Sequence, residues 1–163
     1  LRTKYLELCF TSNLSIFDLI IIEFIRFYFT EFCLIIVFSA LPLLAPEMPY
    51  RVNIYLSWEG AYRLYQGHIP FKDFGLPMGF IYWVIPAIFF KVFGPYLITL
   101  IKAQAFINVI TGVAFRSILR NLQLKSGERI ICLMIFGLTY IMYNYWPWYN
   151  HTDIEFEIID LSL

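Results

Sequence analysis

Charged residues are scarce in this chain of 163 residues: Asp, Glu, Lys and Arg together make up only 15% of it. An average soluble domain has about 25%. Hydrophobic residues reach 60% and aromatic residues 20%, which is more apolar surface than a soluble core of this size can bury. The composition therefore predicts that a lipid bilayer surrounds much of the chain. The formal net charge is zero, which gives no reason to expect a nucleic-acid partner.

Motifs that are typical of soluble enzymes are also absent. The sequence has no Gly-rich phosphate loop, no GxSxG nucleophile elbow and no HExxH zinc helix, so a soluble nucleotide site is not supported. Cys9, Cys33 and Cys132 are far apart, and their spacing predicts neither a disulfide framework nor a zinc site. We assign no metal ligands and no certain cofactor, although a divalent metal stays compatible with the sequence.

Long apolar runs dominate what is present. Three of them are free of Lys, Arg, Asp and Glu, and another is interrupted only by Lys102 and Arg116. In chain order the runs cover 32–46, 76–90, 96–119 and 130–152, and a further apolar stretch opens at 154–161. This pattern predicts an all-α fold, a polytopic membrane helical bundle with about four transmembrane or re-entrant segments plus the start of a fifth.

The beginning of the chain has a different pattern. Three charged side chains interrupt the apolar stretch at 14–29, and each costs about 2.5–3.5 kcal/mol at the centre of a membrane helix. We therefore expect an uncertain N-terminal segment over 1–31, with an interfacial helix as its favoured form. Residues 32–163 are expected to form an incomplete transmembrane domain, because the chain starts without Met and stops where a new apolar run opens.

A polar loop at 47–75 separates the first two apolar runs. Within it, residues 53–66 predict a short amphipathic helix that ends at Gly67. Its aromatic residues recur on one face at spacings of three and four: Tyr55, Trp58, Tyr62 and Tyr65. The neighbouring face is polar and carries Glu59, Arg63 and Gln66. Because Tyr and Trp favour the membrane–water boundary, we expect an interfacial helix with its aromatic side in the headgroups.

The basic residues indicate an orientation. Four of them cluster near the connector between the third and fourth runs: Arg116, Arg120, Lys125 and Arg129. The positive-inside rule places this connector in the cytoplasm and the loop at 47–75 on the outer face. Passing from outside to inside between residues 79 and 116 requires an odd number of crossings, whereas the sequence shows two apolar runs there. Either one run does not fully cross, or the charge rule misleads.

The polar loop and the end of the fourth run supply the candidate site residues. Glu59 is the candidate general base that deprotonates a hydroxyl acceptor, and Arg63 would hold an anionic group. The alternative is a surface ion pair worth under about 1 kcal/mol. Asp73 is either a substrate-binding residue or the cap of its loop. His151 and Asp153 are either substrate-binding residues or ordinary interfacial polar groups.

Two strings in the polar loop carry a resemblance: WEGAYRLYQG at 58–67 and IPFKDF at 69–74, followed by an apolar run and an FFKVFG turn at 89–94. Together they resemble the N-terminal part of polytopic GT-C glycosyltransferases, which include mannosyltransferase-like and aminoarabinose-transferase-like enzymes of bacteria. In that family the first outer loop often reads Asp-Glu-[Gly/Ala]-x-Tyr. Trp58 stands where many members have Asp, which leaves Glu59 alone for the role of base.

The resemblance implies a membrane glycosyltransferase. Its activity would be transfer of a sugar from a polyprenyl-phosphate donor to a glycan or lipid acceptor, in the synthesis of cell-surface glycan or glycolipid. The location would be the bacterial cytoplasmic membrane, with the first loop on the outer face. A second acidic position of the family matches Asp153, with Glu155 and Glu157 close by. The alternative is a non-enzymatic polytopic membrane protein, either a transporter or a polysaccharide-assembly subunit.

Overall fold

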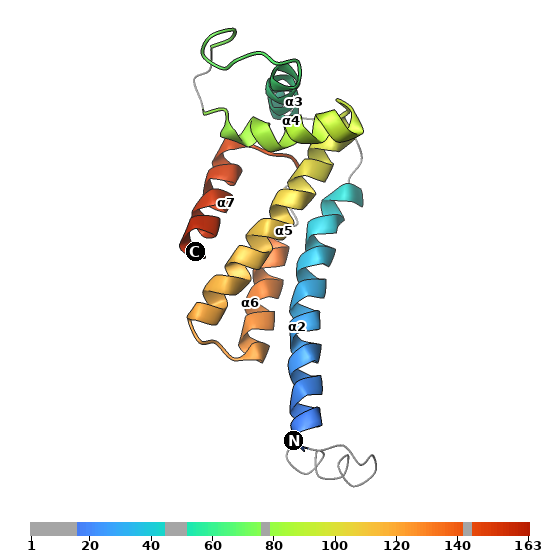
Figure 1. Ribbon diagram of the computed structural model, residues 1–163, viewed down its shortest axis with the longest axis vertical. Helices are drawn as coiled ribbons and strands as arrows, with labels where there is room; N and C mark the ends of the chain where they lie inside the picture. The colour runs from blue at the N-terminus through green and yellow to red at the C-terminus, as the bar shows by residue number, and fades with distance from the viewer. Residues whose placement is uncertain (1–15, 45–51, 76–78, 142–144) are drawn as a thin grey trace.

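The computed structural model describes residues 16–44, 52–75, 79–141 and 145–163, and in this part of the chain the fold is all-α, as predicted (Figure 1). Six α-helices and one 3₁₀ helix follow one another: α2 (Ile16–Ala40), η1 (Leu41–Leu44), α3 (Val52–Tyr65), α4 (Ile81–Phe93), α5 (Leu97–Asn121), α6 (Ser126–Thr139) and α7 (Tyr149–Leu161). Strand-like pairing in these residues is limited to an isolated bridge between Pro70 and Phe74.

The helices form a lengthwise bundle with a cap on one end. Helices α2, α5, α6 and α7 run along the long axis, while α4 lies across one end of them (Figure 1). Helix α3 packs on α4 at the same end, and we call residues 52–75 and 79–93 the end cap. The connector between α5 and α6 lies at the opposite end (Figure 1). The polar loop and the basic connector, which the sequence assigns to opposite faces of a membrane, therefore lie at opposite ends of the molecule.

Helix α4 runs across the end of the bundle and not along it (Figure 1). Helix α4 ends at Phe93 and is capped by Gly94, whose φ of 85° suits glycine better than other residues. The N–H of Gly94 donates to Phe90 O over 2.9 Å. Pro95 follows, and the chain turns into α5. Because α4 lies across the bundle, α5 alone carries the chain from the end cap to the opposite end (Figure 1). The chain therefore makes one lengthwise passage between residues 79 and 116.

The lengthwise helices differ in how far they reach. Within the described residues, α5 is the one helix that is both long and apolar enough to cross a membrane, and more than half of its most apolar stretch is buried inside the protein. Its 25 residues extend about 37 Å. Helix α6 has 14 residues and α7 has 13, whereas a membrane-crossing helix needs about 20.

The expectation of one continuous segment over 130–152 was wrong. Helix α6 ends at Thr139, and α7 begins ten residues later at Tyr149. Pro147 lies just before α7, and a proline in this position does not continue a helix because it lacks an N–H. Its carbonyl oxygen accepts a 2.6 Å hydrogen bond from Ser57 Oγ of α3, which ties the break between the two helices to the end cap.

Two glycines allow α2 to pack closely between α5 and α6. A Cβ added at Gly112 of α5 would lie 2.7 Å from Ile35 Cγ2 of α2, which is too close for a real contact. A Cβ added at Gly137 of α6 would overlap the ring of Phe38 in the same way. Small residues at helix crossings let backbones approach, as is usual between membrane helices.

Helix α2 is continuous from Ile16 to Ala40. The boundary that we expected between residues 31 and 32 therefore falls inside one helix. Residues 1–15, which made up about half of the expected N-terminal segment, lie outside the described part of the chain.

Candidate functional site

Helix α3 matches the helix predicted at 53–66, and its C-terminus is closed as the sequence indicates. Gly67 has a φ of 88°, its N–H donates to Leu64 O over 3.0 Å, and the N–H of His68 donates to Arg63 O over 3.0 Å. This pair of bonds is the Schellman arrangement, in which glycine takes the left-handed position. The loop that follows is therefore held at a fixed angle to α3.

The aromatic face of α3 packs inward, where we had expected it to lie in lipid headgroups. Trp58 stacks on Tyr62 with ring centres 4.8 Å apart, and both are partly buried against the cluster that contains Phe90 of α4. Tyr65 meets the same phenylalanine edge-on at 6.4 Å. Among the predicted aromatic residues, Tyr55 is the exception and is 49% exposed. The spacing within α3 did not reveal that α4 supplies an apolar partner for this face.

The candidate base faces outward from the end cap. One oxygen of Glu59, Oε1, accepts hydrogen bonds from Arg63 Nη2 at 2.6 Å and Arg63 Nε at 3.1 Å. The two side chains remain 53% and 38% exposed, respectively. The guanidinium of Arg63 also lies 5.3 Å from the ring centre of Phe74 in the following loop. Glu59 is thus a solvent-reachable carboxylate whose neighbour is a cation able to bind an anionic group.

Asp73 holds the loop together. Its Oδ2 accepts a 2.7 Å hydrogen bond from the backbone N–H of Ile69, and its own N–H donates to Ile69 O over 2.9 Å. The N–H of Phe71 donates to Phe74 O over 2.9 Å, with Phe71 at a φ of 64°. These contacts correspond to the loop-capping alternative for Asp73. They also bring Phe74 to Arg63, so the loop and the ion pair form one surface.

His151 and Asp153 lie in the first turns of α7, which starts beside the end cap, and both are exposed (Figure 1). The carbonyl oxygen of His151 accepts a 2.9 Å hydrogen bond from the Tyr140 hydroxyl. No hydrogen bond or ion pair among the described residues joins these two to Glu59 or Arg63.

A buried polar cluster between α5 and α7 was not among the predicted site residues. Gln104 Nε2 donates to Asn108 Oδ1 and to Glu155 Oε1, each over 2.9 Å, and all three side chains are fully buried. Asn108 Nδ2 donates to Ile141 O over 3.4 Å. The signal was present in the sequence, because Gln104, Asn108 and Thr111 share one face of an otherwise apolar helix.

A second buried cluster joins α2, α5 and α6 near the end opposite the cap. Glu31 is fully buried and receives Arg116 Nε at 2.6 Å on Oε2 and Arg129 Nε at 2.8 Å on Oε1. The guanidinium of Arg116 lies 4.6 Å from the ring centre of Tyr28 and 4.7 Å from that of Phe32. The sequence placed Arg116 and Arg129 near the basic connector, but it did not predict that they converge on one carboxylate.

The described residues contain no group of three or more His, Cys, Asp and Glu side chains arranged to hold a metal ion. Comparison with known proteins finds no matching family model, no matching curated protein and no matching solved structure.

Proposed function

We propose that this chain belongs to an integral membrane protein whose lengthwise helices lie in the bilayer. Large apolar side chains are exposed along α2, α5 and α6, where water would be an unfavourable neighbour. They include Ile36, Val37, Phe106, Ile110, Val113, Ile131, Ile135 and Leu138. The close glycine crossings at Gly112 and Gly137 are of the kind that membrane helices use.

The proposed orientation follows from the two ends of the bundle. The connector between α5 and α6, with Arg120 and Lys125, lies on the cytoplasmic side by the positive-inside rule. The end cap then lies at the outer boundary of the membrane, with α4 along the interface. Helix α5, at about 37 Å, is long enough to connect the two boundaries of a bilayer whose apolar part is about 30 Å thick.

Within that membrane protein, we propose that the end cap serves sugar transfer from a polyprenyl-phosphate donor. The observation that carries the proposal is the exposed Glu59 carboxylate beside Arg63, on a helix that is held at one end of the bundle. A general base must reach the hydroxyl whose proton it removes, and an exposed carboxylate satisfies that condition. Arg63 is suited to the phosphate of the donor, since a guanidinium binds phosphate oxygens in pairs. The resemblance of residues 58–74 to GT-C glycosyltransferases supports the same reading.

The test is sugar transfer by the intact protein with Glu59→Gln. This change keeps the size of the side chain and removes its ability to accept a proton, so transfer should fall by about 100-fold or more. Glu157→Gln is the matched control, because Glu157 is also an exposed glutamate but lies on α7. Normal transfer by the Glu59 variant, with normal membrane insertion, would remove Glu59 from the mechanism.

A non-enzymatic role is the other candidate, and one observation favours it. Glu59 and Asp73 are both engaged within the end cap, Glu59 with Arg63 and Asp73 with its own loop. If these contacts are structural, the cap is a binding surface of a transporter or polysaccharide-assembly subunit. In that case Glu59→Gln and Glu157→Gln would have the same small effect on function.

A further inference from the structure

The Glu31 cluster carries more positive than negative charge. One carboxylate is shared by Arg116 and Arg129, so the buried group has one positive charge in excess. Arg116 is only 5% exposed, and its Nη2 has no hydrogen-bond partner in the described part of the chain. A buried guanidinium with incomplete pairing is strongly disfavoured unless another anion neutralises it. The cluster therefore has the charge imbalance of an anion site.

The surroundings of the cluster add to this imbalance. Arg120, one turn further along α5, is exposed, and its guanidinium lies 5.7 Å from the ring centre of Tyr28. Arg116 lies over the same ring, so both cations gather at one tyrosine. Lys125 is exposed in the connector. Glu128 is the acidic residue nearest in sequence to Arg120 and Lys125. Its Oε2 already accepts a 2.9 Å hydrogen bond from the backbone N–H of Lys125.

We propose that Arg116 and Arg120, beside Tyr28, form a binding site for a phosphate group that carries a net negative charge. Arg120 supplies accessible N–H donors. The excess positive charge of the buried Glu31 cluster adds electrostatic attraction for the phosphate. Basic pockets between membrane helices on the cytoplasmic side commonly take anionic headgroups. The proposal rests on the membrane placement in the proposed function and not on sugar transfer. The phosphate could come from a lipid headgroup or from free phosphate, and the chemistry of the site is the same for both.

The experiment measures ligand-dependent stability and bound lipid for the intact protein in neutral detergent. The protein is titrated separately with phosphatidylglycerol, phosphatidylcholine and inorganic phosphate, the unfolding temperature is recorded, and retained lipid is counted by native mass spectrometry. A ligand that binds the folded protein raises this temperature. We expect phosphatidylglycerol to raise it and to remain bound, with phosphatidylcholine doing neither. An equal rise with inorganic phosphate would assign the same site to free phosphate.

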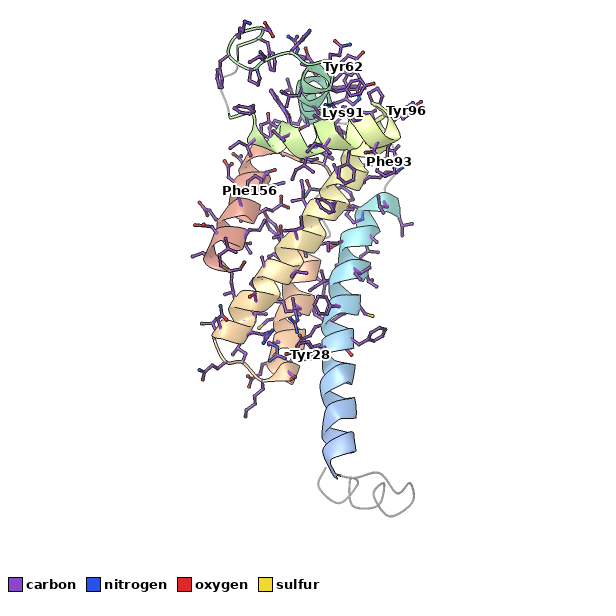
Figure 2. The ribbon with its side chains drawn as sticks, viewed as in Figure 1. Tyr28, Tyr62, Lys91, Phe93, Tyr96 and Phe156 are labelled. Atoms are coloured by element: carbon purple, nitrogen blue, oxygen red, sulfur yellow. The ribbon has the colours of Figure 1, made fainter. Side chains whose placement is uncertain are left out.

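Two variants locate the site. Arg120→Gln removes one exposed cation beside Tyr28, and we expect it to weaken phosphatidylglycerol binding about fivefold. Lys91→Gln is the matched control, since Lys91 is an exposed cation in the end cap, at the other end of the molecule from Tyr28 (Figure 2). Binding by this control should equal that of the unmodified protein.

Two results would overturn the site. The first is equal retention of phosphatidylglycerol and phosphatidylcholine together with no rise in unfolding temperature on adding inorganic phosphate. The second is an equal weakening of phosphatidylglycerol binding by Arg120→Gln and Lys91→Gln. The outcome is independent of catalysis. If the protein transfers sugar but binds neither phosphatidylglycerol nor inorganic phosphate preferentially, only this site is overturned. If it binds phosphatidylglycerol but does not transfer sugar, only the proposed transferase activity is overturned.

Discussion

The indole ring of Trp83 lies directly against the backbone of Gly60, at the point where α4 crosses α3. A Cβ added at Gly60 would overlap the atoms of this ring. Trp83 cannot easily move aside, because it is 4% exposed and also contacts Tyr82 and Phe74 at ring-centre distances of 4.9 and 6.1 Å. The glycine that follows Glu59 is therefore required for the end cap to close, and it fixes how α3 is placed on α4.

Gly60→Ala should destabilise the protein by about 1–3 kcal/mol, the usual cost of overpacking a closed core. Gly127→Ala is the control, because Gly127 lies in the first turn of α6 and an added Cβ there would meet no atom within 4 Å. Alanine at that site should be neutral or stabilise by up to about 1 kcal/mol. The measurement is unfolding in detergent. Similar effects of the two substitutions would contradict the close crossing of α3 and α4.

Glu31→Gln should destabilise the protein by about 3–5 kcal/mol, because it leaves Arg116 and Arg129 without their shared carboxylate. Glu59→Gln, which breaks an exposed ion pair, should cost under about 1 kcal/mol. The same unfolding measurement compares the two variants. An equally small loss for both would mean that the Glu31 cluster does not hold α2, α5 and α6 together.

The cluster between α5 and α7 calls for a double-mutant cycle. Gln104→Leu removes the donor to Glu155 and should cost about 1–3 kcal/mol, because a buried carboxyl oxygen loses the hydrogen bond from Gln104. In the protein that already carries Gln104→Leu, Glu155→Leu should cost less stability than it does in the unmodified protein, because both polar groups are then absent. A coupling energy of about 0.5–3 kcal/mol is expected from free energies of unfolding. Strict additivity would show that the two side chains do not interact.

Much of the fold follows from local sequence signals. The helix at 53–66, its end at Gly67 and the turn at Gly94 depend on spacing and on glycine conformation, and the structure has all three. The division of 130–152 into two helices and the transverse course of α4 did not follow. An apolar run indicates burial or lipid contact, but it does not indicate how the helix is oriented. A helix that lies across the end of a bundle and one that runs along the bundle therefore look alike in sequence.

Part of the candidate site could also be predicted from the sequence, and part could not. Pairing of Glu59 with Arg63 was predictable, because residues four apart on a helix are neighbours. The convergence of Glu31, Arg116 and Arg129 was not, because it joins three helices that are distant in sequence. Glu155 was noted only as a residue near Asp153, yet it is Glu155 that faces the bundle while Asp153 is exposed. Which side of a helix faces the core depends on packing partners that one sequence does not identify.

The most direct test of the account is labelling from each side of intact membrane vesicles. Single thiols are introduced by Glu59→Cys and by Lys125→Cys, after the native cysteines are replaced, and each variant is treated with a membrane-impermeant reagent. We expect the thiol at position 59 to react only from the outside and the thiol at position 125 only from the cytoplasmic side. Reaction of both from the same side, or of position 59 only from the cytoplasmic side, would contradict the account.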